Sequence, residues 1–290
     1  MKPAPFRYFA PQTLEEALDL LARYGDEAKV LAGGQSLIPM MNFRLLTPAV
    51  LIDLNTVQSL FYIRPEGEGL AIGAMTRQRR LEDTPLVAER APLLQEAIPF
   101  VAHPQIRNRG TVGGSLAHAD PAAELPAVVI ALNARLKAQS KEGERWIAAT
   151  DFFQELFTTA LEPQELLTEI VIPPLPPRTG WAFSEVTRRH GDYALTGVAA
   201  TVTLDATGCC TDARLVLLSV GAVPVHARQA VNPLIGELPT AERIRAVAEA
   251  VDAEIDPPED IHASAAYRRG LARVLSQRTL SRAVERAQRE

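Results

Sequence analysis

The N-terminal region opens with a pattern of apolar residues that is typical of an amphipathic helix. Apolar side chains from Leu14 to Leu21 repeat on one helical face. Thr13 and Glu16 stand at the spacing of a capping box, and Gly25 suits the position that ends a helix. We therefore predict a helix that begins after Thr13 and ends at Gly25.

Two short apolar runs, Val30-Leu31 and Val50–Leu54, follow this helix and predict buried strands. A helix beside short hydrophobic strands favours a small α/β unit. We place this unit at residues 1–57.

From about residue 58 the pattern becomes that of a mixed α+β unit. The elements expected there are strands at 70–73, 132–138 and 166–172 and helical stretches at 85–89 and 92–100. The proline cluster at 173–177 is stiff and extended, so it predicts a domain boundary. We expect a first domain at 1–175, with subdomains at 1–57 and 58–175, and a second domain at 178–290.

The last third of the chain has the alternation of an antiparallel meander. Strands are expected at 183–187, 198–204 and 213–220, with a turn at 205–208. Cys209 and Cys210 lie beside that turn, and we expect them to be buried in a strand, with a redox pair as the alternative. Helical spacing beyond Pro239 predicts a helical tail that ends in a long helix from about Ser264.

Composition and charge exclude several classes of protein. Apolar residues make up 47% and charged residues 22% of the chain, which is ordinary for a globular protein. The net charge is −5 and no basic stripe is visible, so nucleic acid is not an expected partner. Short basic clusters such as Arg77–Arg80 are interpreted as solvated faces or subunit contacts.

No run approaches the roughly 20 apolar residues that cross a bilayer, and residues 1–10 do not resemble a signal peptide, so a cytoplasmic location is expected.

Two glycine pairs form the candidate ligand site. Gly33-Gly34 follows a predicted strand, and Gly113-Gly114 follows Thr111. Consecutive glycines let backbone N–H groups converge into a nest for phosphate oxygens, and the hydroxyls of Ser36, Thr111 and Ser115 stand nearby. Each pair taken alone is more often only a tight turn. Two pairs with hydroxyl neighbours indicate a phosphate-bearing ligand and nothing more specific.

Other motifs with known chemistry are absent or misplaced. Gly67–Gly73 resembles a dinucleotide fingerprint, but its third glycine is one position late and the segment precedes a strand. The five histidines show no metal-ligand spacing, and two adjacent cysteines cannot supply the spaced ligands of a zinc or iron–sulfur centre. A hydrolase or a metalloenzyme has no support, and we assign no catalytic or metal-binding residue.

The residues around both glycine pairs resemble one family in detail. Segments 32–41 with 52–54, and 106–116 with 120–124, are similar to the FAD-binding medium subunit of molybdenum hydroxylases, which is the carbon monoxide dehydrogenase and xanthine dehydrogenase family. The likeness continues through 72–76, 166–173 and 188–195 in the order of the family. It covers essentially the whole chain.

This resemblance implies an α+β chain with the PCMH-type FAD-binding fold, followed by a C-terminal antiparallel sheet with a helical tail. It also implies FAD as the cofactor. The diphosphate would lie between residues 29–36 and 110–115, with Asp120 and Glu124 toward the ribityl or adenosine part and Tyr193 near the isoalloxazine ring. The full set of implied cofactor contacts is Lys29, Val30, Leu31, Ala32, Gly33, Gly34, Gln35, Ser36, Leu37, Val101, Gly110, Thr111, Val112, Gly113, Gly114, Ser115, Asp120, Glu124, Leu167 and Tyr193.

The same resemblance implies electron transfer inside a larger complex. FAD would take electrons from iron–sulfur clusters that a molybdenum site feeds, and this chain lacks the cysteines for such clusters. The expected partners are an iron–sulfur small subunit and a molybdenum-bearing large subunit, in a dimer of heterotrimers. Peripheral attachment to the inner membrane through the complex is the alternative to a purely cytoplasmic place. The substrate stays open, as does the electron acceptor, which could be NAD, a quinone or dioxygen.

Two other functions stay open at this point. A self-contained FAD oxidoreductase would turn over its substrate as the isolated chain, whereas an assembly subunit that has lost FAD would be colourless. The intact glycine pairs argue against the second. Two departures from the family also stand out: Glu124 occupies a position where many relatives carry Asp, and Glu185 lies in a strand where a lysine is common, so no cationic flavin contact is carried over.

Overall fold

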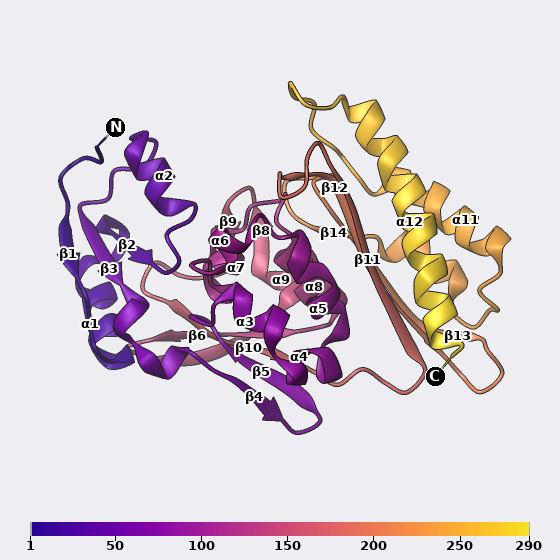
Figure 1. The fold of residues 1–290 in the computed structure, drawn as a ribbon, viewed down its shortest axis with the longest axis horizontal. Coiled ribbons are helices and arrows are strands. Elements are labelled where there is room, and N and C mark those ends of the chain that lie inside the picture. The colour runs from indigo at the N-terminus through magenta and orange to yellow at the C-terminus, as the bar shows by residue number, and fades with distance from the viewer. Residues whose placement is uncertain (1, 290) are drawn as a thin grey trace.

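Three sheets follow one another along the chain in the computed structural model, which describes residues 2–289. Figure 1 shows the N-terminal sheet at one end of the molecule, a five-stranded sheet in the middle, and the C-terminal sheet with its long helix at the other end. The mixed α+β class expected from the hydrophobic pattern is therefore confirmed.

The N-terminal sheet is parallel, with strand order β1-β3-β2. Its elements are β1 (Arg7–Phe9), α1 (Leu14–Tyr24), β2 (Ala28–Leu31), α2 (Leu37–Asn42) and β3 (Val50–Asp53). The capping box is confirmed, since the Glu16 N–H donates to Thr13 Oγ1 at 3.2 Å, and Gly25 ends α1 with a φ of 44°. The buried side chains of α1 join those of β3 in one hydrophobic core.

The middle sheet is antiparallel, with strand order β4-β5-β10-β6-β7. Its strands are β4 (Ile63–Glu66), β5 (Gly69–Gly73), β6 (Arg135–Ser140), β7 (Gly143–Ala148) and β10 (Leu166–Ile172), and β8 (Phe153–Glu155) pairs with β9 (Thr158–Thr159) beside it. The helices are α3 (Gln78–Asp83), α4 (Pro85–Arg90), α5 (Pro92–Ala97), α6 (Pro104–Arg107), α7 (Val112–His118), α8 (Glu124–Ala131) and α9 (Ala149–Phe152). The glycines at 67 and 69 form a hairpin between β4 and β5, as expected for a segment that is no dinucleotide fingerprint.

The strand expected at 132–138 is wrong in its first three residues. Helix α8 occupies the preceding segment, Leu132 caps it, and β6 begins only at Arg135. All eight residues of α8 are buried, because the helix packs against α5, α7 and the C-terminal sheet. A helix that is apolar on every side has no amphipathic pattern, so its sequence resembles a buried strand.

The C-terminal sheet is an antiparallel meander, which confirms the expected pattern. Its elements are β11 (Thr179–Thr187), β12 (Ala194–Leu204), β13 (Cys210–Leu218), β14 (Val225–His226), α10 (Arg228–Val231), α11 (Ala241–Ala250) and α12 (Ala265–Ala287). Cys210 is buried at the start of β13, as expected, but Cys209 lies half-buried in the turn before it. None of the helices within residues 2–289 combines the length and the hydrophobicity that a bilayer crossing demands.

The two faces of the C-terminal sheet are covered by different helices. Phe183, Ala199 and Val216 belong to the core that includes α8, whereas Ala182 and Val198 belong to the core that includes α12. This alternation follows from the two-residue period of a strand. The sheet therefore joins the middle part of the molecule to the helical tail, as the position of α12 in Figure 1 shows.

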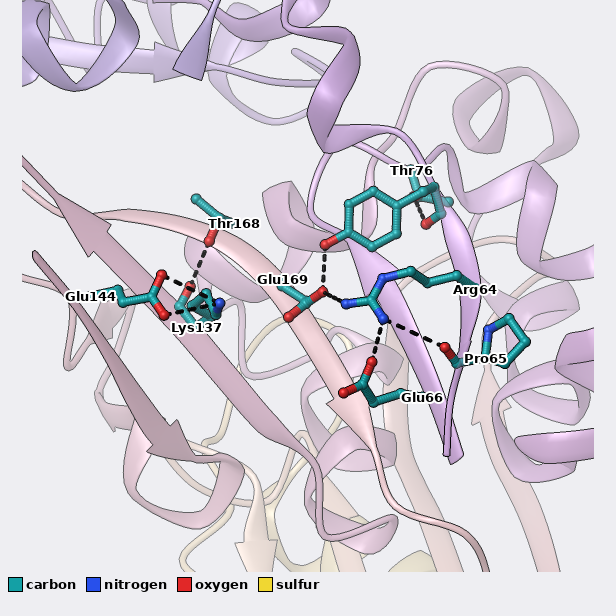
Figure 2. A network of polar contacts seen from close by, with 9 residues as sticks. Arg64, Pro65, Glu66, Thr76, Lys137, Glu144, Thr168 and Glu169 are labelled. Carbon is teal, nitrogen blue, oxygen red and sulfur yellow. Dashed lines mark hydrogen bonds and ion pairs between the residues drawn. The ribbon is translucent and has the colours of Figure 1, made fainter. Parts of the chain in front are cut away.

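A polar network on the middle sheet holds the segment that leads into the candidate site. Figure 2 shows Arg64 between Glu66 and Glu169. The Tyr62 hydroxyl donates to Glu169 Oε2 at 2.6 Å, and Arg64 Nη2 donates to the same oxygen at 2.7 Å. The Tyr62 carbonyl in turn accepts from Thr76 Oγ1 at 2.8 Å. The network thus fixes the backbone near Thr76.

We expect Glu169→Ala to destabilise the fold by about 2 kcal/mol, because it leaves the half-buried Tyr62 hydroxyl without its acceptor. Glu66→Ala is the matched control, since Glu66 also pairs with Arg64 but its side chain is 45% exposed. That control should cost less than about 0.5 kcal/mol. Urea unfolding of the full chain measures both, and equal losses in the two variants would show that burial of Glu169 adds nothing.

Candidate cofactor site

The two glycine segments, far apart in sequence, lie side by side. A Cβ placed on Gly33 would stand 2.5 Å from the Arg109 carbonyl oxygen and 2.7 Å from Gly110 Cα. A Cβ on Gly114 would stand 3.2 Å from Ala32 Cβ. Real Cβ atoms do not come within 3.0 Å of such neighbours, so the contact between the two segments requires glycine at position 33, whereas the contact at Gly114 is only tight.

The first glycine segment leaves its backbone donors free. Gly34 has a φ of 73°, in the left-handed region, between the end of β2 and the start of α2. Within residues 2–289, the N–H groups of Gly33, Gly34, Gln35 and Ser36 donate to no protein acceptor. All four residues are half-buried, so the segment is not enclosed in the core. Adjacent N–H groups without a protein acceptor are what a phosphate nest at the first glycine pair would require.

The second glycine pair is not a turn, which corrects the expectation for it. Gly113 and Gly114 lie in the first turn of α7, with Thr111 as the N-cap. The Gly113 N–H donates to the Ala74 carbonyl at 2.8 Å, and the Gly114 N–H donates to Thr111 Oγ1 at 3.1 Å. The prediction of a nest of free N–H groups at this second pair is therefore wrong. Glycine is needed at 113 for space, because a Cβ there would stand 2.5 Å from Ala74 Cβ.

Two residues that tie the segments together were not singled out as site residues by the sequence. Asn55 Nδ2 donates to the Ala32 carbonyl at 2.9 Å. The Arg77 guanidinium donates both to Asn55 Oδ1 and to the Arg109 carbonyl. The interpretation of Arg77 as part of a solvated face is wrong, since its charge bridges the loops of the site. The one sequence feature that could have indicated this bridging role is the position of Arg77, four residues after Gly73 at the end of β5.

The other end of the site is acidic and lies beyond α7, which at seven residues spans about 10 Å. Glu124 is the first residue of α8 and is 7% exposed. Burial raises the pKa of Glu124 to about 7, and the Asp120 charge adds to this, while the backbone N–H and Arg107 oppose it. Burial raises the pKa of Tyr193, and the charges of Asp120 and Glu124 raise it further. Tyr193 as a whole residue is 66% exposed.

A cavity of about 160 Å³ lies beside Tyr193. Pro121, Ala122 and Leu195 contribute apolar wall, and Ser219 and Arg268 contribute polar groups. The chain therefore brings an open aromatic side chain, a mostly apolar hollow and two carboxyl groups together at this end.

The remaining implied contacts fall into two groups. Lys29 is exposed on β2, next to the half-buried Val30 and Leu31, and Leu37 begins α2. Val101 and Leu167 are buried in the hydrophobic core that also holds α7. Val101 and Leu167 are therefore largely covered by the protein, whereas Ser115 is half-buried in the first turn of α7.

The structure brings two parts of the chain forward as candidates for a cofactor: the paired glycine segments, and the surroundings of Glu124 and Tyr193. Residues 4–175 match the model of the FAD binding domain in molybdopterin dehydrogenase, and residues 181–283 match that of the CO dehydrogenase flavoprotein C-terminal domain. The chain therefore belongs to this family, as an FAD-binding medium subunit of the molybdenum hydroxylase type. The resemblance noted in the sequence and the assignment of FAD as the cofactor are confirmed.

Relatives share the whole length of the chain. It is 46% identical, over 99% of this chain and 97% of the relative, to the 6-hydroxypseudooxynicotine dehydrogenase complex subunit alpha of Paenarthrobacter nicotinovorans. A carbon monoxide dehydrogenase from Hydrogenophaga pseudoflava that lacks the Mo-pyranopterin moiety of the molybdenum cofactor matches with a TM-score of 0.96, 39% identity and 99% coverage of both chains. Quinoline 2-oxidoreductase from Pseudomonas putida 86 matches with a TM-score of 0.93, 39% identity and 99% coverage of both chains.

Proposed function

We propose that this chain is the electron-transfer subunit of a complex of the carbon monoxide dehydrogenase and xanthine dehydrogenase type. The FAD that this chain holds would serve as the relay between iron–sulfur clusters of a partner subunit and an external acceptor. The observation that carries the proposal is the contact between the two glycine segments, with four free N–H groups on the first of them.

The chain's own residues hold the cofactor in three places. The N–H groups of residues 33–36 would donate to the diphosphate oxygens, with the hydroxyls of Ser36, Thr111 and Ser115 beside them. Asp120 and Glu124 take the hydroxyls of the ribityl or adenosine part. Tyr193 covers the isoalloxazine ring, and Val101 and Leu167 support the site from the core. When bound, FAD supplies the ability to accept electrons one at a time and release them as a pair.

The partners are an iron–sulfur small subunit and a molybdenum-bearing large subunit, in a dimer of heterotrimers. The two cysteines of the chain are adjacent, so they cannot ligate a cluster that needs four spaced thiolates. The protein's contribution is therefore position and electrostatics, with no acid–base residue required in this chain.

The proposal is tested by purifying the tagged chain from its native host and measuring flavin, iron and molybdenum. We expect FAD together with iron and molybdenum in the intact complex. After the subunits are separated, FAD should stay with this chain and the metals with the others. FAD without any metal-bearing partner would favour the self-contained oxidoreductase, and a colourless chain would favour an assembly subunit.

A further inference from the structure

Ser219, the residue that follows β13, joins the segment Asp120–Ala122 to the segment Tyr193–Leu195. Its N–H donates to the Pro121 carbonyl at 2.9 Å, and its hydroxyl donates to the Ala194 carbonyl at 2.7 Å. Each segment begins with a residue that the proposed function gives to the cofactor. One serine, which is itself no proposed cofactor contact, therefore ties two parts of the proposed site together.

The backbone of Ser219 has a conformation that serine rarely adopts. Its φ is 60°, in the left-handed region, and the residue is 5% exposed. A residue with a Cβ persists there only where its surroundings hold it in place. Glycine would take the same conformation without strain, but it has no hydroxyl to donate to Ala194. The hydrogen bond to Ala194 therefore offsets a conformational cost that glycine would avoid at this position.

A second buried group holds the same segment of β12 from the helical tail. Arg268, near the start of α12, is 4% exposed, and its Nη1 donates to the Leu195 carbonyl at 2.5 Å. Its Nη2 donates to Asp260 Oδ2 at 2.8 Å. The start of β12 is thus held at two consecutive carbonyls, and both Ser219 and Arg268 also line the cavity beside Tyr193. Arg268 fastens the segment to α12, whereas Ser219 fastens it to the other segment of the proposed site.

We propose that Ser219 is a positioning residue of the flavin site, which holds Tyr193 at a fixed place relative to Asp120. This inference rests on the proposed function, in which Tyr193 covers the isoalloxazine ring. Tyr193 is 66% exposed, so its place depends mainly on the backbone that carries it. Loss of the Ser219 hydroxyl frees this backbone at Ala194, and Tyr193 then covers the ring for less of the time.

Hydrogen exchange in the full chain without FAD tests the link itself. Ser219→Ala removes the hydroxyl and keeps the strain, whereas Ser219→Gly removes both. In each variant we expect the amides of Tyr193–Leu195 to exchange about tenfold faster, which is the effect of one buried hydrogen bond. Ser276→Ala is the matched control, because that serine is buried on α12 and its hydroxyl has no partner within residues 2–289. Unchanged exchange in the folded Ser219→Gly chain, or an equal gain in Ser276→Ala, would overturn the proposal.

The fluorescence of bound FAD tests the consequence, since a tyrosine ring packed on the isoalloxazine quenches this fluorescence. We expect Ser219→Gly to lose much of the quenching and to weaken FAD binding by about fivefold, with Ser276→Ala unchanged in both. In a chain that already carries Tyr193→Leu, adding Ser219→Gly should have no further effect, because Ser219 acts through Tyr193.

The outcomes of the flavin experiment separate the inference from the proposed function. Full quenching in the folded Ser219→Gly chain, or an equal loss of affinity with and without Tyr193, would contradict the positioning role of Ser219. Failure of every chain to bind FAD, wild type included, would contradict the proposed function. The exchange experiment needs no cofactor, so it would still decide whether Ser219 holds the Tyr193 backbone.

Discussion

Replacing Gly33 by alanine should weaken FAD binding by about 100-fold while leaving the three sheets folded. The added methyl group would stand 2.5 Å from the Arg109 carbonyl oxygen and 2.7 Å from Gly110 Cα, both of them backbone atoms. The two segments must then separate, and the free N–H groups of residues 33–36 move away from Thr111. Fluorescence titration of the full chain with FAD measures the change.

The matched control for this experiment is Gly270→Ala, on α12. A Cβ at that position meets no atom within 4 Å, so FAD affinity should be unchanged. Circular dichroism of both variants shows whether the fold survives. Wild-type affinity in a folded Gly33→Ala chain would mean that the contact between the glycine segments is irrelevant to the cofactor.

Gly180→Ala should have the largest effect on stability, a loss of about 3 kcal/mol. Gly180 lies on β11 where α12 crosses the sheet, and a Cβ there would overlap the Ala283 carbonyl oxygen and the Ala287 nitrogen. Because both atoms belong to the helix backbone, α12 as a whole must shift from the sheet. The hydrophobic core that it shares with β11 and β12 would open.

The same Gly270→Ala variant serves as the control, with the opposite expected sign. Alanine in an open helical position raises stability by up to about 1 kcal/mol. Urea unfolding of the two variants should therefore move the midpoint in opposite directions. A Gly180→Ala chain as stable as wild type would contradict the close approach of α12 to β11.

Local signals in the sequence predicted those parts of the fold that depend on local chemistry. The capping box at Thr13, the meander from β11 to β13 and the helix after Ser264 are all present. Helix α8 was missed because its burial on every side removes the polar face by which a helix is recognised. Its environment is set by α5, α7 and the C-terminal sheet, which no local pattern reveals.

The candidate site also has features that local sequence predicts and contacts that only the fold creates. A glycine pair predicts conformational freedom, and Gly34 adopts a left-handed backbone conformation with a φ of 73°. Whether a glycine exposes its N–H or makes room for a neighbour depends on the tertiary partner, and Gly113 makes room for Ala74. The contacts of Asn55 and Arg77 likewise join segments that only the fold brings together. Resemblance to a family supplied the cofactor's identity, which the spacing alone could not.

The most direct test of the central claim is hydrogen exchange at the backbone amides of Gly33–Ser36, measured in the full chain with and without FAD. These four N–H groups donate to no protein acceptor within residues 2–289, so they should exchange fast in the free chain. On binding, we expect them to become strongly protected, with no change in the amides of α11. Tight FAD binding with unchanged exchange at Gly33–Ser36 would contradict the assignment of the diphosphate to this segment.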